Sequence, residues 1–434
     1  MGSQPVRTPN AGSVFSNVLW LYADQGLRAV IALMAFSAVT RYLGPEQFGV
    51  LSYAVAFPAM FLPLASLGLE FVVVQELVRR PTERMAILAT AARLIGVASL
   101  LSLGSAAAAT TFLPVDHAAR PMIWVTMIAL LGQPFQVIDF FFQSRVAARY
   151  AVVARLGSAL AVNAFRFWLV WHGATVNWFA WAAVIEAGAT ALGLMLAFRM
   201  AGETSLAWWR GATRAEARRL LLAAWPLMAG GVAMVFFLRF DQLLLSLWAG
   251  DAALGKYAAA MRLADAAQFV TYAFVSSWFP QLVAAHRAGA GDFKAATERL
   301  FRRITHLSLA VALGVSLAAP WIVGGLLGQR FEGTGGVLVV LAWANVFAAQ
   351  ITVRGKWFLL EGWQVSSLGF FVLGAVVHLS LLAWLAPAHG ALGAAIAFTV
   401  AQAAMSLAAP VLAGKTRLAA SLAWRSFLPA KSTS

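Results

Sequence analysis

The chain has 434 residues, of which 61% are hydrophobic and 11% are charged, and its formal net charge is +15. A soluble domain has about 25% charged residues, so this composition argues against a soluble protein and favours one embedded in a lipid bilayer. The chain has no cysteine, which excludes disulfides, thiolate catalysis and cysteine-ligated metals. Its basic residues follow the loops between apolar stretches and are not interleaved with aromatic residues, so we do not expect nucleic acid as a partner.

Twelve long apolar stretches follow a polar N-terminal segment. Each has about 20 residues or more, which is enough to cross the hydrocarbon core as a helix. None shows strand-like alternation, so helices must satisfy the backbone hydrogen bonds. The predicted fold class is an all-α membrane protein with about 12 transmembrane helices in two six-helix lobes around a central cavity. The stretches lie at 15–39, 48–77, 86–112, 121–143, 152–172, 177–199, 220–248, 256–284, 304–327, 334–360, 364–386 and 390–412.

Lysine and arginine residues gather in alternate segments between these stretches, and the positive-inside rule then places both termini in the cytoplasm. The first stretch carries Asp24 and Arg28 and lacks a clear small-residue cleavage site, so we expect a retained helix and not a signal peptide. The basic residues of the opposite, outward segments are Arg41, Arg120, Lys256 and Arg330.

The longest connection, 201–219, lies on the basic side and holds Trp208, Trp209 and four arginines. We interpret it as a linker between the lobes that rests on anionic lipid headgroups. The predicted domains are a cytoplasmic N-terminal tail at 1–14, an N-terminal six-helix lobe at 15–199, a basic cytoplasmic linker at 200–219, a C-terminal six-helix lobe at 220–412 and a cytoplasmic C-terminal tail at 413–434.

Two turns indicate that the lobes are repeats of one unit. Gly44-x4-Gly49 lies between the first two predicted helices, and Gly250-x4-Gly255 lies between the seventh and the eighth, 206 residues later. A six-helix unit repeated in tandem keeps its orientation in the membrane. The lobes should therefore be related by an axis along the membrane normal, with a cavity between them.

No constellation of residues predicts an enzyme. The segment from Gly250 to Lys256 matches the opening of a phosphate-binding loop, but Tyr257 stands where that loop needs Ser or Thr, and the segment follows a helix. The six histidines show no metal-binding spacing such as His-x3-His. We therefore expect a transporter that needs no cofactor and no metal.

Charged residues at membrane depth are the most informative feature of the chain. Each costs about 2.5–3.5 kcal/mol at the bilayer centre, so such residues usually face a wet cavity or a partner. Asp24 with Arg28, and Arg262 with Asp265, have helical spacings that allow each pair to neutralise itself on one helix face. The other charges at this depth include Glu70, Asp139 and Glu186.

Pairing along a helix does not account for Arg239, because Asp241 is two residues away and points apart, or for Arg166, whose helix offers only Asn163 nearby. Guanidinium groups suit phosphates because they stay charged and bind two oxygens at once. We predict a cavity that binds a diphosphate head group through Arg28, Arg166, Arg239 and Arg262. Candidates for ion coupling or pairing are Asp24, Asp241 and Asp265.

Several segments, in their order and spacing, carry a resemblance to a known family. They are Asn17-x7-Gln25-x2-Arg28, then Arg41-Tyr42-Leu43-Gly44-Pro45-Glu46-Gln47-Phe48-Gly49, then Arg239-Phe240-Asp241-Gln242-Leu243-Leu244-Leu245, then Gly255-Lys256-Tyr257 through Arg262-Leu263, then Phe279-Pro280, and then Gly328-Gln329-Arg330-Phe331. The chain resembles bacterial polysaccharide transporters and O-antigen flippases, which belong to the multidrug/oligosaccharidyl-lipid/polysaccharide exporter superfamily. The resemblance runs over nearly the whole chain.

This resemblance implies an inner-membrane flippase that moves an undecaprenyl-diphosphate-linked oligosaccharide to the outer leaflet by alternating access, for O-antigen, capsule or exopolysaccharide biosynthesis. It implies a basic cavity lined by the first helices of each lobe, to which Asp24, Arg28, Arg239, Asp241 and Arg262 would contribute. A polysaccharide polymerase and chain-length machinery are the partners that it suggests, besides the substrate and the bilayer. The candidate glycan contacts are Asn17, Gln25, Gln133, Gln136 and Gln268.

Two other functions stay open at this point. A cation-coupled drug or metabolite antiporter of the same superfamily would favour carboxylates over arginines in its cavity. A membrane polysaccharide polymerase normally needs a sizeable outward loop, whereas the outward segments here have only a handful of residues. Unchanged resistance to cationic dyes after deletion would discard the antiporter, and longer glycans made by the purified protein would support the polymerase.

Overall fold

The computed structural model describes residues 11–112, 119–145, 147–202, 211–412 and 414–427, with side chains described at all of these positions except 11–29, 148, 364–366, 368, 412 and 415. Throughout these residues the regular structure is helical and contains no strand, which confirms the predicted all-α class. The side chains of Asn17, Asp24, Gln25 and Arg28, which the sequence singled out, therefore lie outside the described part.

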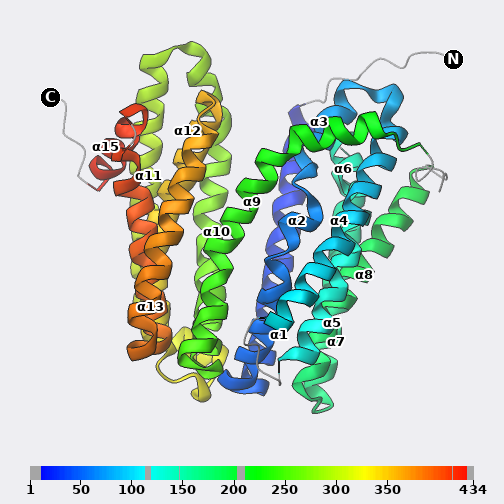
Figure 1. Cartoon of the computed structure of the whole chain (residues 1–434). Helices are drawn as coiled ribbons and strands as arrows, with labels where there is room; N and C mark the ends of the chain where they lie inside the picture. Colours follow the sequence, from blue (N-terminus) through cyan, green and yellow to red (C-terminus); the bar gives the residue numbers. More distant parts are fainter. Residues whose placement is uncertain (1–10, 113–118, 146, 203–210, 413, 428–434) are drawn as a thin grey trace.

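The first half of the chain forms one group of helices, which we call the N-terminal bundle, seen in blue to teal in Figure 1. Short 3-10 segments, named η1 and η2, interrupt it. Its elements are α1 (Ala11–Ala59), α2 (Leu62–Ser66), α3 (Leu69–Arg79), η1 (Pro81–Glu83), α4 (Arg84–Phe112), α5 (Arg120–Ile128), η2 (Ala129–Gln136), α6 (Val137–Ser144), α7 (Ala148–Trp171) and α8 (Val176–Met200).

The second half forms the C-terminal bundle, which the long helix α9 links to the first half (Figure 1). The two bundles approach each other at one end, here called the far end, and diverge toward the end that holds α3 and α15, here called the basic end. The elements of the second half are α9 (Arg214–Ala249), α10 (Asp251–Ala288), α11 (Ala290–Ile322), η4 (Val323–Leu327), η5 (Gln329–Phe331), α12 (Thr334–Glu361), α13 (Gln364–Ala403), η6 (Ala404–Ala408), α14 (Ala409–Leu412), η7 (Gly414–Thr416) and α15 (Arg417–Arg425).

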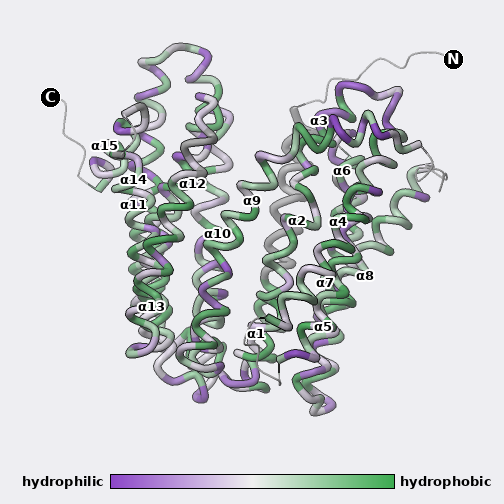
Figure 2. Tube along the Cα trace, in the orientation of Figure 1, coloured by the Kyte–Doolittle hydropathy of each residue, from purple (hydrophilic) through white to green (hydrophobic). Residues whose placement is uncertain are grey.

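Nine segments among the described residues are long and apolar enough to cross a membrane. Two of them, Val30–Arg79 and Gly369–Val411, contain a glycine with non-helical backbone angles, Gly44 and Gly390, at which the chain reverses direction. Figure 2 shows hydrophilic positions along α10, which is not among the nine. The predicted count of twelve spans, the lobe boundaries and the cytoplasmic placement of both termini stay predictions.

Proline residues shape two of the predicted helices. The stretch predicted at 48–77 is broken into α1, α2 and α3 near Pro58 and Pro63, with Leu67 and Gly68 in the left-handed region. Pro134 lies inside η2, where the stretch predicted at 121–143 tightens from α-helical to 3-10 geometry. Both breaks agree with the loss of one backbone donor at each proline.

The beginning of α9 is anchored to the N-terminal bundle by an ion-pair network at the basic end. Thr213 caps the helix by accepting a hydrogen bond from the backbone of Glu216 at 3.2 Å. The Arg80 guanidinium contacts the carboxylates of Glu216 at 2.5 Å, Glu83 at 2.8 Å and Glu76 at 2.8 Å. These bonds, with Glu216 the largest contributor, raise the pKa of Arg80 above its usual value. This network therefore holds the beginning of α9 beside the end of α3.

We expect Arg80→Ala to destabilise the protein by about 1.5–3 kcal/mol, the contribution of charge-assisted hydrogen bonds. The replacement removes the cation that bonds to both Glu216 and Glu76, and leaves Arg219, 3.2 Å from Glu76, as a remaining partner. Thermal unfolding in detergent measures the loss. Arg79→Ala is a matched control, because the Arg79 side chain is 61% exposed and its nearest pairing distance, to Glu76, is 3.8 Å. Equal melting temperatures for the two variants would show that the network does not anchor α9.

Candidate functional site

A cavity of about 330 Å³ lies between the two bundles, where α1, α7 and α8 face α9 and α10. Its wall combines an apolar part with seven polar or charged side chains. Phe36, Phe48 and Phe179 supply aromatic surface. The polar and charged lining residues are Ser52, Arg166, Glu186, Arg239, Gln242, Arg262 and Asp265.

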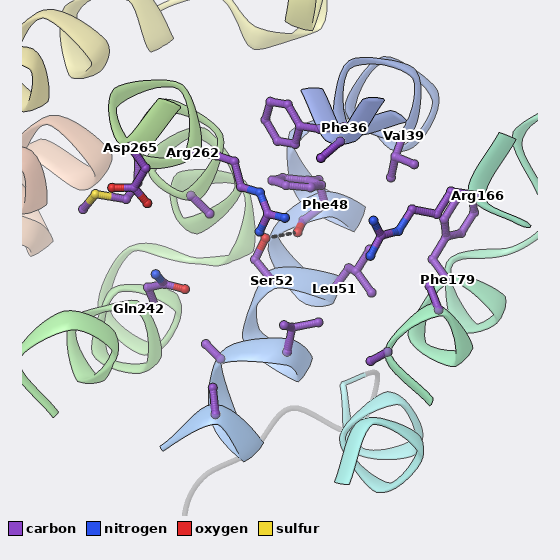
Figure 3. Close-up of a pocket in the computed structure, with 18 of the residues that line it drawn as sticks. Phe36, Val39, Phe48, Leu51, Ser52, Arg166, Phe179, Gln242, Arg262 and Asp265 are labelled. Atoms are coloured by element: carbon purple, nitrogen blue, oxygen red, sulfur yellow. Dashed lines mark hydrogen bonds between the residues drawn. The ribbon is translucent and has the colours of Figure 1, made fainter. Parts of the chain in front are cut away.

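Two of the lining arginines enter the cavity from opposite bundles. Figure 3 shows Arg166 on α7 and Arg262 on α10 pointing toward the same space. Arg166 donates a hydrogen bond to Asn163 Oδ1 at 3.1 Å, and its other Nη atom lies 3.6 Å from a Glu186 carboxylate that is 53% exposed. An ion pair this open to solvent contributes little, so Arg166 keeps most of its capacity to bind an anion.

The helical spacing of Arg262 and Asp265 allows an ion pair on α10, but the structure shows none between them. Arg262 and Asp265 both line the cavity and are exposed to it, yet neither Arg262 nor Arg239 makes an ion pair with a carboxylate in the part of the chain that the structure describes. Figure 3 shows the two side chains of α10 pointing in different directions. Arg239 and Arg262 still interact electrostatically with Asp265, at longer range.

The cavity therefore concentrates positive charge. Three guanidinium groups face two carboxylates across it, and Arg262 is close enough to both Arg166 and Arg239 to interact unfavourably with them. Like charges held together in a place of reduced solvation raise the free energy of the empty site. An anion that enters between them relieves this repulsion, which makes the arrangement suited to a multiply charged anion.

Asp241 lies elsewhere, which corrects the expectation that it lines the cavity. Its side chain is 0% exposed and accepts hydrogen bonds from the Tyr257 hydroxyl at 2.5 Å and from the backbone N–H of Gln242 at 2.8 Å. The Nε2 atom of His378 on α13 lies 3.8 Å from the same carboxylate. Arg239 and Asp241 do point apart, as their spacing on α9 requires, and of the two only Arg239 reaches the cavity.

The glycan-contact predictions find little support in this geometry. Gln133 and Gln136 lie in η2 and Gln268 lies on α10, all half-buried, and none of them lines the cavity. Asp139, one of the charges at membrane depth, is paired with Arg155 at 2.7 Å. The glycan-contact prediction rests on the polarity of the glutamines alone, and polarity does not tell which face of a helix meets the cavity.

Some lining residues escaped the sequence reasoning. Glu186 was recognised as a charge at membrane depth but not as a neighbour of Arg166. Gln242 comes three residues after Arg239 and therefore lies on the same face of α9. This spacing could have placed it in the cavity wall. Nothing in a chain with 30 phenylalanines marks Phe36, Phe48 or Phe179 as cavity residues.

Comparison with known proteins bears directly on this site. A family of sequences described as polysaccharide biosynthesis proteins matches residues 14–286, which include all the cavity-lining residues. The chain belongs to this polysaccharide biosynthesis protein family. A putative O-antigen transporter of Shigella dysenteriae is 24% identical over 177 residues, which are 41% of this chain and 44% of that protein. The match thus spans less than half of the curated relative.

The fold of this family member is shared with solved membrane transporters. The lipid II flippase MurJ, in an inward closed conformation, superposes with a TM-score of 0.75 at 10% identity, covering 94% of this chain and 91% of that one. A multidrug resistance MATE family transporter of the MOP superfamily, in an inward-facing conformation, superposes with a TM-score of 0.72 at 16% identity, covering 91% and 95%. The polysaccharide biosynthesis protein is therefore a multi-pass membrane protein with the fold of this transporter superfamily.

Proposed function

We propose that this polysaccharide biosynthesis protein is a flippase for an undecaprenyl-diphosphate-linked oligosaccharide in the bacterial inner membrane. The observation that carries the proposal is the convergence of Arg166, Arg239 and Arg262 in one cavity between the bundles, where the described side chains include two carboxylates. The substrate would then move from the cytoplasmic to the outer leaflet by alternating access, and supply O-antigen, capsule or exopolysaccharide synthesis.

The arginines would hold the diphosphate, since a guanidinium stays charged and offers two parallel donors to phosphate oxygens. A volume of about 330 Å³ is at the small end of ligand pockets, so it suits a diphosphate with its first sugar and not a whole oligosaccharide. The remaining sugars would extend toward the basic end, where the bundles diverge (Figure 1). The prenyl chain would stay in lipid, because burying it in a charged cavity gains nothing.

Asp241 is buried with Tyr257 and His378. This position favours a structural role, in which Asp241 pairs with these two side chains, over a direct contact with the substrate. Asp265 is the described carboxylate on α10 that faces the cavity. We propose that Asp265 moderates the affinity of the site so that the diphosphate can leave, since a site that binds too tightly does not turn over.

Asp265→Asn should accordingly bind the diphosphate more tightly and release it more slowly. Removal of the negative charge that interacts with both Arg239 and Arg262 is expected to tighten binding by about tenfold, the effect of one nearby charge at moderate screening. Binding of a short polyprenyl diphosphate to the purified protein measures the change. Asp292→Asn is the control, because it makes the same change at an exposed aspartate in the first turn of α11. It should leave the affinity unaltered. Weaker binding by Asp265→Asn would show that the carboxylate helps to hold the substrate.

The function itself is tested by reconstituting the protein in vesicles with a fluorescent undecaprenyl-diphosphate oligosaccharide. We expect the protein to equilibrate the lipid between the leaflets, and vesicles without protein to retain the initial asymmetry. A second arm adds a cationic dye, the cargo that the antiporter alternative would take. Dye transport without lipid movement would replace the flippase proposal by that alternative. Longer glycans in the same vesicles would indicate a polymerase.

A further inference from the structure

The two repeat-related turns meet each other at the far end of the molecule. A Cβ atom added at Gly49 on α1 would overlap the backbone carbonyl of Asp251, and one added at Gly255 on α10 would overlap the backbone carbonyl of Pro45. Each of these Cβ atoms would also lie 3.0 Å from the backbone nitrogen of the other glycine. The two backbones are therefore in direct contact, which no residue other than glycine allows at these positions.

This contact is reciprocal in the sense of the repeat. Pro45 and Asp251 are 206 residues apart, and so are Gly49 and Gly255. Gly49 lies against Asp251, which is the equivalent of Pro45. Gly255 lies against Pro45 itself. The two glycines, which are equivalent positions, also lie against each other, as in a self-complementary contact across a two-fold axis. A contact of this kind lies on the axis that relates the two bundles. Opening of the cavity at this end must therefore separate the two backbones.

An arginine closes the same end from the N-terminal bundle. The Arg41 guanidinium donates hydrogen bonds across the interface to the backbone carbonyls of Gly325, of Gly324 at 3.5 Å and of Leu326 at 3.2 Å. The Ser37 hydroxyl donates to the carbonyl of Leu326 at 2.6 Å. These carbonyls belong to η4, which ends the long helix α11 and has the acceptor groups that every helix C-terminus leaves free.

An aromatic layer separates this closure from the cavity. Phe48 lines the cavity and packs edge-to-face on Phe36 of the same helix, with ring centroids 5.7 Å apart. It also packs on Phe331 of the C-terminal bundle, with centroids 6.4 Å apart. The path from the cavity to the far end is therefore closed in succession by aromatic rings, by the glycine contact and by Arg41.

We propose that Arg41 and the Gly49–Gly255 contact form the gate on the far side of the transporter, with Arg41 as its latch. Opening of the cavity to that side requires Arg41 to release the η4 carbonyls and the two glycines to separate. The latch also gives Arg41 a role in a segment where the topology disfavours basic residues. The inference rests on the alternating access of the proposed function, but not on the identity of the substrate.

The absence of cysteine from the chain allows a direct test. Ser52→Cys places a single thiol on the cavity wall, and a membrane-impermeant maleimide added to either face of oriented membranes reports which side reaches it. No substrate is present, so accessibility and not transport is measured. We expect Arg41→Ala to increase the rate of labelling from the far side by about tenfold, the effect of losing one charge-assisted hydrogen bond in a two-state equilibrium.

Arg120→Ala is the matched control, because it also removes an arginine from this end of the N-terminal bundle. Among the described residues, Arg120 donates no hydrogen bond to the C-terminal bundle. A second route to the open gate is Gly255→Ala, with Gly188→Ala as its control, since a Cβ at Gly188 meets no atom within 4 Å. Arg41→Lys, which keeps the charge but not the fork of donors, should fall between Arg41→Ala and the parent.

Unchanged far-side labelling in folded Arg41→Ala and Gly255→Ala proteins would overturn the gate. If Arg41→Ala does not fold, Gly255→Ala and Arg41→Lys decide the question in the same way. A normal gate in a protein that moves no lipid-linked oligosaccharide would instead reject the proposed function and leave the gate standing.

Discussion

Arg262→Ala is expected to reduce flipping of the lipid-linked oligosaccharide by roughly 100-fold. The Arg262 side chain points into the cavity, and no carboxylate among the described side chains forms an ion pair with it, so we expect its donors to bind the substrate. A bidentate contact to phosphate consists of two charge-assisted hydrogen bonds. Their loss raises the activation free energy by about 3 kcal/mol, which corresponds to the 100-fold lower rate. The rate of lipid movement in reconstituted vesicles measures it.

Arg166→Ala should have a smaller effect, since part of its guanidinium is already used by Asn163 and Glu186. Arg199→Ala, which removes an exposed arginine from the last turn of α8 outside the cavity, is the control for loss of net charge. Normal flipping by well-expressed Arg262→Ala and Arg166→Ala proteins would remove the arginine cavity from the mechanism.

The second large effect concerns stability. Asp241→Ala is expected to destabilise the protein by about 1–3 kcal/mol, because it leaves the Tyr257 hydroxyl buried without its acceptor. The loss should appear as a lower melting temperature in detergent. Asp241→Asn retains an acceptor for Tyr257 and should lose less.

Asp265→Ala provides the contrast for this prediction. Its carboxylate faces the cavity and can be solvated, so the replacement should cost less than about 1 kcal/mol. Similar melting temperatures for Asp241→Ala and Asp265→Ala would mean that the buried cluster does not stabilise the C-terminal bundle.

The fold class followed from the sequence because bilayer solvation leaves few options. A chain that is 61% hydrophobic and has no strand-like alternation must satisfy its backbone with helices. The cost of charge in lipid also picked out Arg166, Arg239 and Arg262, which the structure brings to one cavity. Here a single local rule was enough, since each unpaired arginine needs a wet surface whatever the tertiary arrangement.

The remaining features depend on tertiary structure. Spacing showed that Arg239 and Asp241 diverge, but both faces of α9 are covered, one by the cavity and the other by α10 and α13, so spacing did not tell which residue met which face. The glycine turns were recognised as a repeat, yet their mutual contact arises only when the two bundles pack. Arg41 stood out only as an exception to the charge bias, and its partners are backbone carbonyls 283 to 285 residues away.

The central claim is that the cavity arginines recognise a diphosphate, and the most direct test compares two ligands that differ by one phosphate. Binding of a short polyprenyl diphosphate and of the matching monophosphate to the purified protein would be measured at the same ionic strength. The arginine cavity predicts that the diphosphate binds at least about tenfold more tightly, and that Arg262→Ala abolishes this preference. Equal affinity for the two ligands in the unmodified protein would contradict it.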